Sequence, residues 1–551
     1  MRAVLLLIAT ALADPCPPNA AAFTRPSGIT DNMRVKYSNI FSVIYHENYK
    51  VVQYDPTQSV LKYGWPNSAM VGQAPPDLVL YECGTTKPTT AFNDVKADAH
   101  FISIPPERVS LPGTQTFHVF ELLSVTEAIH LIDMSYASSP CMQLLEECTP
   151  GIHAAPGTSA WQTAMQDAQV TFTNSWGSGA SNTTRDVVFS ASVDGGILHR
   201  VEWLKFVALF FNKEVMGAQI FDQIAADVLA LEAESARLRA ASEENVPSVA
   251  WVANQACSAP ECAAVTAGSW VQKADGNWCR CGSFYLIYNS LYRRDLTTNA
   301  GGRLLSLPGQ SAENCTLTTN SDGSGTYECT SENLQHFLQL LGGADLIIDE
   351  TFVLNHGAYS LDDFVRNFGL DGANAPSLKA REAGAVYRID GSVSDARADG
   401  TVGTNWYEQM PVQPQVLQSE MMEAIWGSAF KGRCAKTYMR HLYNDHTRDP
   451  LEHSDCPLYD AGGSHDCAAI HDYEHTVHQC MPAPAAEASG SDPLVLGLAL
   501  GLGIPLCLLL LSVLGYCIYR SQKPPKTPVP SPTGPGGAVV GIPVSDAGEK
   551  A

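Results

Sequence analysis

The chain has 551 residues, of which 45% are hydrophobic and 17% are charged, as in folded globular proteins of two or three domains. Its formal net charge is -23. Nucleic acids and anionic membrane surfaces repel such an acidic protein, so both classes of partner are excluded.

The N-terminus predicts export. Residues 1–13 combine Arg2, an apolar run and the small-x-small triplet Ala11–Ala13, which is typical of a signal peptide cleaved near Ala13. The run is shorter than the roughly 20 residues that a membrane helix needs. We expect a removed signal peptide and then an N-terminal extension over 14–34. The alternatives are an N-terminal anchor and an ordinary buried segment.

Residues 35–200 predict an N-terminal α/β lobe. Strand-like runs at Phe41–Tyr54 and Asp77–Gly84 precede HFISIPPERVSL, which leads into the helical stretch FHVFELLSVTEAIHLI. Two further runs, QVTFTN and DVVFSASV, have the β-branched and aromatic content of strands. This alternation of strands and helices is typical of an α/β fold.

Residues 201–244 predict a long connecting helix. The segment Val201–Glu214 is too apolar for a surface helix, and Gln219–Arg239 continues with apolar residues at helical spacing opposite acidic ones. A helix of roughly 25 to 35 residues spans about 40 to 50 Å, enough to bridge two small lobes. We expect its apolar first half to be buried where it packs on both lobes.

Residues 245–430 predict a second α/β lobe. We expect strands at SVAWVAN, ADLIIDET and AVYRIDG, and helices at Phe284–Arg294 and VLQSEMMEAIWGSAF. The predicted fold class is therefore α/β, with two Rossmann-like lobes joined by a long helix.

An ordered series of segments over roughly residues 35 to 430 resembles the type III periplasmic substrate-binding proteins that import vitamin B12, siderophores and metals. The segments are ISIPPERVSL with TQTFHVFELLSVTEAIHLID, then VEWLKFVALFFNKE with AQIFDQIAADV, VPSVAWV, TNAGGRLL, ADLIIDE, VYRIDG and TNWYEQMP with QVLQSEMMEAIW. The resemblance implies a clamshell that binds its ligand between two lobes with little conformational change. It also implies no enzyme activity and no required cofactor.

Two further segments, YHENYKVVQ and VLYECGTTKP, resemble cell-surface proteins of this fold from algae, which include cobalamin acquisition proteins and ferric-siderophore receptors. The implied small-molecule ligand is cobalamin first and a ferric siderophore second. Two Ser/Gly-rich inserts, 177–184 and 306–330, depart from the bacterial pattern, so coupling to an ATP-driven permease is not implied.

In such a clamshell, the ligand contacts residues at the carboxyl ends of strands and in the loops after them. Each aromatic residue taken singly is more often core packing. As a set, the predicted ligand-binding residues are Trp65, Tyr81, Thr116, Phe117, Trp176, Trp251, Asn254, Trp278, Glu350, Phe352 and Trp406.

Most cysteines predict disulfide bonds. Two of the 16, Cys507 and Cys517, lie in the apolar C-terminal run, and the even number that remains fits an oxidising compartment. Cys315 and Cys329 flank a Gly/Ser-rich turn, where we expect a disulfide. A zinc site is the alternative for the group Cys257, Cys262, Cys279 and Cys281. The glycosylation sequons at Asn182 and Asn314 fit export.

Residues 431–482 are rich in cysteine and histidine, and we expect a disulfide-stapled, membrane-proximal cap. His471–His475 matches the HxxEH pattern of inverted zinc peptidases, but a catalytic domain around it is lacking. His471, His475 and His478 have the spacing of one helix face, so a metal cluster is the alternative.

The apolar run Leu494–Tyr519 follows a linker at 483–493 and is long enough for a transmembrane helix. Arg520, Lys523 and Lys526 come next, so we expect a single-pass type I protein of the plasma membrane with an extracellular N-terminal part. Gly497 and Gly501 form a GxxxG motif, typical of homodimer contacts in membranes.

The tail, 520–551, is proline-rich and suits endocytic adaptors with SH3 or WW modules. Uptake of the ligand also requires a transporter that the sequence does not name.

Two rival classes of function are a metal-dependent surface enzyme and an adhesion or signalling ectodomain without a ligand. The chain has no GxSxG, P-loop or HExxH motif, so we predict no catalytic residues.

Overall fold

The structure is a computed structural model that describes most of the chain between residues 34 and 480. The described residues are 34–55, 75–88, 96–174, 184–242, 246–272, 278–319, 323–372, 375–398, 400–430, 434, 437–444, 450–458, 467, 469–471, 475, 477–478 and 480. The predicted signal peptide, membrane span and tail lie outside them, as do Trp65, Trp176 and Asn182. Within these ranges, no helix has the length and apolar character that crossing a bilayer requires.

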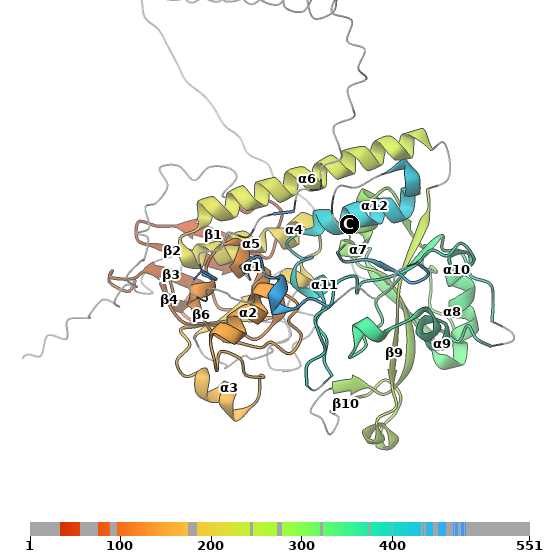
Figure 1. Ribbon diagram of the computed structural model, residues 1–551, viewed down its shortest axis with the longest axis horizontal. Helices are drawn as coiled ribbons and strands as arrows, with labels where there is room; N and C mark the ends of the chain where they lie inside the picture. The colour runs from red at the N-terminus through yellow and green to blue at the C-terminus, as the bar shows by residue number, and fades with distance from the viewer. Residues whose placement is uncertain are drawn as a thin grey trace, which may run out of the picture. The chain divides into compact units, whose positions relative to one another are not determined.

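The N-terminal lobe contains two four-stranded sheets (Figure 1). The first has β1 (Phe41–Tyr45), β2 (Tyr49–Tyr54), β3 (Leu78–Glu82) and β4 (His100–Ile104) in chain order, with only the β3–β4 pair parallel. The second is parallel throughout, in the order β6 (Ile129–Ile132), β5 (Val109–Leu111), β7 (Val170–Asn174) and β8 (Asp186–Phe189). All carboxyl ends of the second sheet therefore lie at one edge.

Short helices pack around the second sheet. They are α1 (Phe117–Leu122), α2 (Pro140–Cys148), α3 (Ser159–Ala164), α4 (Ile197–Val201) and α5 (Trp203–Ala208). Every residue of α5 is buried, and Trp203 and Phe206 contact Phe189 edge-on in the core of this lobe. A helix that is apolar on all sides can only be buried in this way.

The expected connecting helix is present but begins later than predicted. The chain turns at Asn212, which has a left-handed φ of 55°, and α6 (Glu214–Ala241) then runs for 28 residues. The apolar residues from Trp203 to Phe211 are therefore not the first half of that helix, because they lie in the core of the N-terminal lobe. At about 1.5 Å per residue α6 spans about 42 Å. It contacts α4 and α5 of the first lobe and α7 and α12 of the second (Figure 1).

The C-terminal lobe is built on one large sheet of mixed direction. Its order is β14 (Cys315–Thr319), β15 (Gly325–Thr330), β12 (Gly282–Asn289), β9 (Ser248–Cys257), β16 (Leu346–Asp349), β17 (Val386–Arg388) and β18 (Arg440–His441). Strand β13 (Arg303–Leu304) pairs with the start of β9, and β10 (Trp270–Gln272) with β11 (Trp278–Arg280) forms a separate ribbon. Strands β9, β16 and β17 are parallel to one another.

The helices of this lobe are α7 (Leu291–Asn299), α8 (Leu334–Leu341), α9 (Leu361–Asn367), α10 (Lys379–Glu382), α11 (Asn405–Glu408) and α12 (Pro414–Trp426). The helix predicted at Phe284–Arg294 was wrong in its first half. Residues 284–287 are buried in a row because β12 is a central strand between β9 and β15. Ser290 then caps α7 by accepting from Arg293 N.

The disulfide predicted between Cys315 and Cys329 is confirmed and joins β14 to β15. Cys262 pairs with Cys281, and three further bonds involve the C-terminal segment: Cys141–Cys456, Cys148–Cys467 and Cys434–Cys480. Five disulfides in the described residues fit the oxidising compartment that export implies. Asn314 is exposed in the turn before β14, and its glycosylation stays a prediction.

The cysteine- and histidine-rich segment differs from the membrane-proximal cap that we expected. Tyr438 and Met439 lie in the core of the C-terminal lobe, whereas Cys456 and Ile470 lie in the core of the N-terminal lobe. The segment is disulfide-stapled as predicted, but it packs on both lobes. None of its described residues from 467 to 480 is helical, so the helix face predicted for His471, His475 and His478 is absent there.

Candidate functional site

The carboxyl edges of the two lobes meet. Tyr136 follows β6 of the N-terminal lobe, and its ring centroid lies 6.3 Å from that of Phe352, which follows β16 of the C-terminal lobe. Gly195, in the loop after β8, is so close to α7 that a Cβ there would lie 2.8 Å from Leu291 Cδ1. Loops after parallel strands of both lobes therefore surround one region, which we call the interlobe site.

Two guanidinium groups lie in this region. Arg293 in the first turn of α7 forms a two-pronged ion pair with Glu350 and stacks on Tyr288, with its Cζ 4.3 Å from the ring centroid. Arg200 of α4 stacks on Tyr292 at 3.5 Å. Burial lowers the pKa of Arg200 to about 10, and the positive charge of Arg293 adds to this effect. The two cations are therefore close enough to repel.

Arg200 keeps hydrogen-bonding capacity. Its Nε donates to Asp194 O at 3.1 Å. Among the residues that the structure describes, no acceptor bonds to either of its Nη groups, and neither Nη is sealed away from solvent. A guanidinium group that is largely buried yet presents free N–H groups is suited to bind an anion.

Three large apolar side chains of the C-terminal lobe are exposed. Phe352 is 55% exposed, Leu354 is 48% exposed and Tyr407 is 43% exposed. The electrostatic influence of Glu350 and Arg293 on the Tyr407 hydroxyl places this ring next to the ion pair. An exposed aromatic ring beside a charged donor is typical of a site for a flat, partly charged molecule.

A buried ion network supports the loop that carries Phe352. Arg388 is fully buried and pairs with Asp349 at 3.0 Å and with Asp390 at 2.6 Å. Its Nη2 donates to Thr351 O at 3.0 Å, and Thr351 Oγ1 accepts from Asn254 N at 2.9 Å. These ion pairs and hydrogen bonds therefore hold the loop against strands β9, β16 and β17, which fixes the position of the exposed Phe352 ring.

Of the predicted ligand-binding residues, Glu350 and Phe352 lie at the interlobe site and Asn254 lies beneath it, 8% exposed. The side chains of Tyr81, Thr116, Phe117, Trp251 and Trp406 are buried. Trp251 donates to Thr297 Oγ1 at 2.9 Å, and its ring lies 5.9 Å from that of Trp406. These five have packing roles here, and ligand contact by them stays a prediction. Trp278 lies in β11, but its side chain is outside the described residues.

Sequence reasoning missed Tyr136, Arg200, Tyr288, Arg293 and Tyr407. Assigning residues 282–289 to a strand would have identified Tyr288 and Arg293 as candidates. Tyr288 then lies near the end of a central strand, and Arg293 lies in the first turn of the helix that follows. Arg200 was not identified because the sequence placed it at the start of the predicted connecting helix and not in a loop after a strand.

A second polar cluster holds the lobes together next to the interlobe site. The Glu408 carboxylate of α11 accepts from Ser138 N at 2.8 Å and from Ser139 N at 3.0 Å, at the N-terminus of α2. Ser139 Oγ donates to Glu121, and His118 contacts Gln413 across the lobes. Burial raises the pKa of Glu408 to about 8, and the nearby Glu121 carboxylate contributes. We call this cluster the latch.

Of the two metal alternatives, the cysteine group has no free thiolates in the described part of the chain. Cys257, Cys262 and Cys281 are the one group there with metal-like spacing, but Cys262 and Cys281 form a disulfide and Cys257 is also disulfide-bonded. Zinc needs thiolates, so this group does not fit it. His471 Nδ1 is 3.3 Å from Thr126 Oγ1, and the ring centroid of His475 is 6.3 Å from that of His118. A metal site formed by His471, His475 and His478 stays a prediction.

No protein-family model and no curated protein matches the chain. Solved structures similar to it include a periplasmic heme-binding protein from Pseudomonas aeruginosa, with 11% identity, 59% of this chain and 94% of that chain covered, and a TM-score of 0.37. A TroA-like periplasmic binding protein, FepB from Veillonella parvula, has 11% identity, 65% and 97% coverage, and a TM-score of 0.38.

The heme complex of IsdE from S. aureus has 11% identity, 58% and 99% coverage, and a TM-score of 0.36. The first two of these structures are named as periplasmic binding proteins. The similarity does not identify a ligand for this chain.

Proposed function

We propose that this protein binds a small, flat, negatively charged ligand at the interlobe site. The observation that carries the proposal is Arg200, whose Nη groups bond to no acceptor among the described residues and whose guanidinium lies close enough to Arg293 for the two charges to repel. The guanidinium groups bind anionic oxygens, and the rings pack on the flat body of the ligand. The residues assigned to the site are Tyr136, Arg200, Tyr288, Arg293, Glu350, Phe352 and Tyr407.

A ferric chelate with carboxylate or catecholate oxygens is the ligand class that suits these groups best. Such a chelate presents several anionic oxygens to the two guanidinium groups. Cobalamin, which the sequence resemblance placed first, has a single phosphodiester and otherwise neutral amides, so it ranks second here. In this proposal the predicted span at 494–519 holds the binding lobes at the cell surface, where they capture the ligand for uptake, and no catalytic step is involved.

Calorimetric titration of the full chain in detergent tests the proposal. The panel contains ferric carboxylate, catecholate and hydroxamate chelates and cyanocobalamin. We expect saturable binding of an anionic ferric chelate and a loss of about tenfold to a hundredfold in affinity for Arg200→Gln, since hydrogen bonds to charged groups contribute about 1.5–3 kcal/mol. Arg200→Lys keeps the positive charge but loses the paired N–H donors of the guanidinium group. Its affinity for the chelate should therefore lie between those of the wild type and Arg200→Gln.

The matched control is Arg237→Gln, which removes an arginine that is 63% exposed on α6 and pairs with Glu234. It should bind as the wild-type protein does. Binding of no member of the panel contradicts the proposal, and so does equal affinity of the Arg200→Gln and wild-type proteins. If the protein binds cobalamin tightly and none of the ferric chelates, the proposed ligand class is wrong. The proposed site is then supported only if Arg200→Gln weakens the binding of cobalamin.

A further inference from the structure

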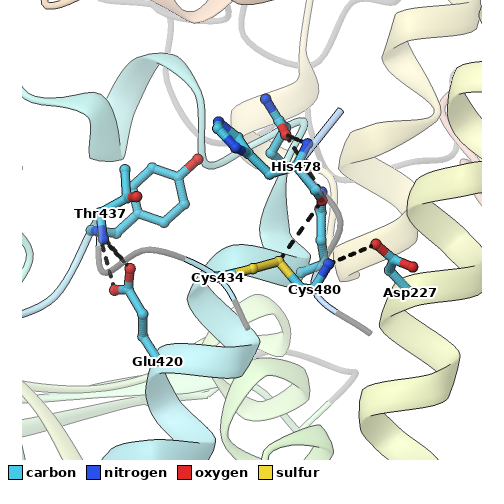
Figure 2. The surroundings of a disulfide bond; sticks show 9 residues. Asp227, Glu420, Cys434, Thr437, His478 and Cys480 are labelled. Atoms are coloured by element: carbon cyan, nitrogen blue, oxygen red, sulfur yellow. Dashed lines mark hydrogen bonds between the residues drawn. A yellow bond between two sulfur atoms is a disulfide. The ribbon is translucent and has the colours of Figure 1, made fainter. Parts of the chain in front are cut away.

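A short C-terminal segment crosses the boundary between the lobes and is fastened at both ends by disulfides. We call the described residues of 467–480 the seam strap. At one end, Cys467 bonds to Cys148 in the last turn of α2, in the N-terminal lobe. At the other end, Cys480 bonds to Cys434, and its N–H donates to Asp227 of α6 at 3.0 Å (Figure 2).

Between its ends, the seam strap contacts one lobe and then the other. His471 lies 3.3 Å from Thr126 Oγ1, and His475 lies edge-on to His118 of α1, both in the N-terminal lobe. His478 N then donates to Gln413 Oε1 at 2.9 Å, and His478 O accepts from Gln415 Nε2 at 3.0 Å, both beside or within α12. Gln413 also contacts His118 across the lobes, so the seam strap lies along the latch.

The two ends differ in access to solvent. Cys467 is exposed and Cys148 is half-buried. Cys480 is fully buried, and the second bond to α2, Cys141–Cys456, is also buried, with exposures of 7% and 1%. A thiol reagent must reach a sulfur atom along the S–S axis, so access favours attack on Cys148–Cys467 before the buried bonds.

We propose that Cys148–Cys467 is a thiol-operated lock that holds the two lobes together across the latch. A dithiol reductant attacks Cys467 Sγ as the thiolate, which breaks the S–S bond, forms a mixed disulfide and releases Cys148 as a thiolate that takes up a proton. The second thiol of the reductant then displaces Cys467. One protein disulfide becomes two thiols, and the dithiol becomes a disulfide.

Reduction frees Cys467 from α2, while Cys434–Cys480 keeps the other end of the seam strap on the C-terminal lobe and Cys141–Cys456 still ties residue 456 to α2. The contacts of His475 with His118 and of His478 with Gln413 and Gln415 are then held less firmly, and the latch opens more often. The proposed function determines which ligand such opening admits or releases, but the opening itself is measured without any ligand.

The test combines differential alkylation with hydrogen exchange on the oxidised full chain during graded reduction by dithiothreitol. We expect Cys148 and Cys467 to be alkylated before Cys141 and Cys456. Once they are, amide exchange in α1 and in the first turn of α12 should accelerate on the order of tenfold, because local opening becomes easier. The double variant Cys148→Ser/Cys467→Ser should show this faster exchange without reductant.

The matched control is Cys315→Ser/Cys329→Ser, which removes a disulfide of the β14–β15 hairpin and should leave exchange in α1 unchanged. Unchanged exchange at the latch after alkylation of Cys148 and Cys467 overturns the lock, and so does earlier reduction of Cys141–Cys456. If the double variant fails to fold, hydrogen exchange during graded reduction of the wild-type protein still tests the lock. A chain that binds no ligand yet opens on reduction refutes the proposed function and leaves the lock standing.

Discussion

At Glu408, a single carboxyl group links the contact between the lobes to pH. Its pKa is raised to about 8 in the folded protein, above the ordinary value of 4.5, because it is buried and close to Glu121. A group with a raised folded pKa stabilises the fold fully below its unfolded pKa, and this contribution is lost as pH rises through the folded pKa. Partial desolvation lowers the pKa values of His475 and His478, so these groups act only below about 6.5.

We therefore expect the free energy of unfolding to fall by about 1–2 kcal/mol between pH 6.5 and pH 8, since one proton is worth about 1.4 kcal/mol per pH unit. Glu408→Gln removes the titrating group and keeps most of the hydrogen bonds to Ser138 and Ser139. Urea unfolding of both proteins at several pH values measures the slope. A slope in the variant as steep as in the wild type contradicts this assignment.

At Arg388, the ion network under Phe352 leads to a second prediction. Arg388→Met leaves Asp349 and Asp390 buried without their main partner, which costs about 3–5 kcal/mol. The matched change Arg366→Met breaks a pair with Asp363 in which the arginine is 66% exposed, so it should cost less than about 1 kcal/mol. Denaturant midpoints of the two variants provide the comparison. Similar losses in both would show that the buried network has no special role.

Some site residues could be predicted from sequence and others could not. Glu350 and Phe352 directly follow a buried strand, so strand order alone placed them at the carboxyl edge. Trp251 lies inside β9, and alternation along a strand does not say which face meets the ligand and which meets the core. It is fully buried against Trp406.

Among the elements, the break between α5 and α6 is a local feature with a measurable cost. Asn212 adopts φ 55°, accepts from Lys50 Nζ at 2.7 Å and donates to Glu82 at 3.1 Å. Asn212→Gly and Asn212→Ala both lose these bonds, but only glycine tolerates the left-handed conformation without strain. We expect the alanine variant to be less stable than the glycine variant by about 1 kcal/mol in urea unfolding. Equal stability would contradict a strained turn.

The helical period could show that 219–239 forms a helix, but it could not show where that helix starts. Both α5 and α6 satisfy the same apolar pattern, and the turn between them depends on Lys50, which is 159 residues away from its acceptor at Leu209 O. The helix predicted at Phe284–Arg294 was wrong in its first half for a related reason. A row of buried residues fits a central strand and a buried helix equally, and only its neighbours β9 and β15 decide.

At the scale of the whole molecule, α6, the latch and the seam strap are among the connections between the two lobes in the described part of the chain. The lobes also approach closely at Gly403, where any Cβ would collide with the carbonyl oxygens of Tyr136 and Ala137. Ligand binding in an oxidised chain should therefore proceed with little hinge motion, in line with the stiff connecting helix that the sequence predicted. Wild-type chains with and without ligand should show the same interlobe spin-label distances, and a large closure on binding would contradict this.

Arg200 is proposed to bind an anionic ligand between the lobes, and titration of an anionic ferric chelate into the wild-type and Arg200→Gln chains measures this binding. We expect saturable binding that weakens about tenfold or more in the variant, while Arg237→Gln binds as the wild type does. Equal affinity in all three proteins, or no binding of any chelate, would contradict it.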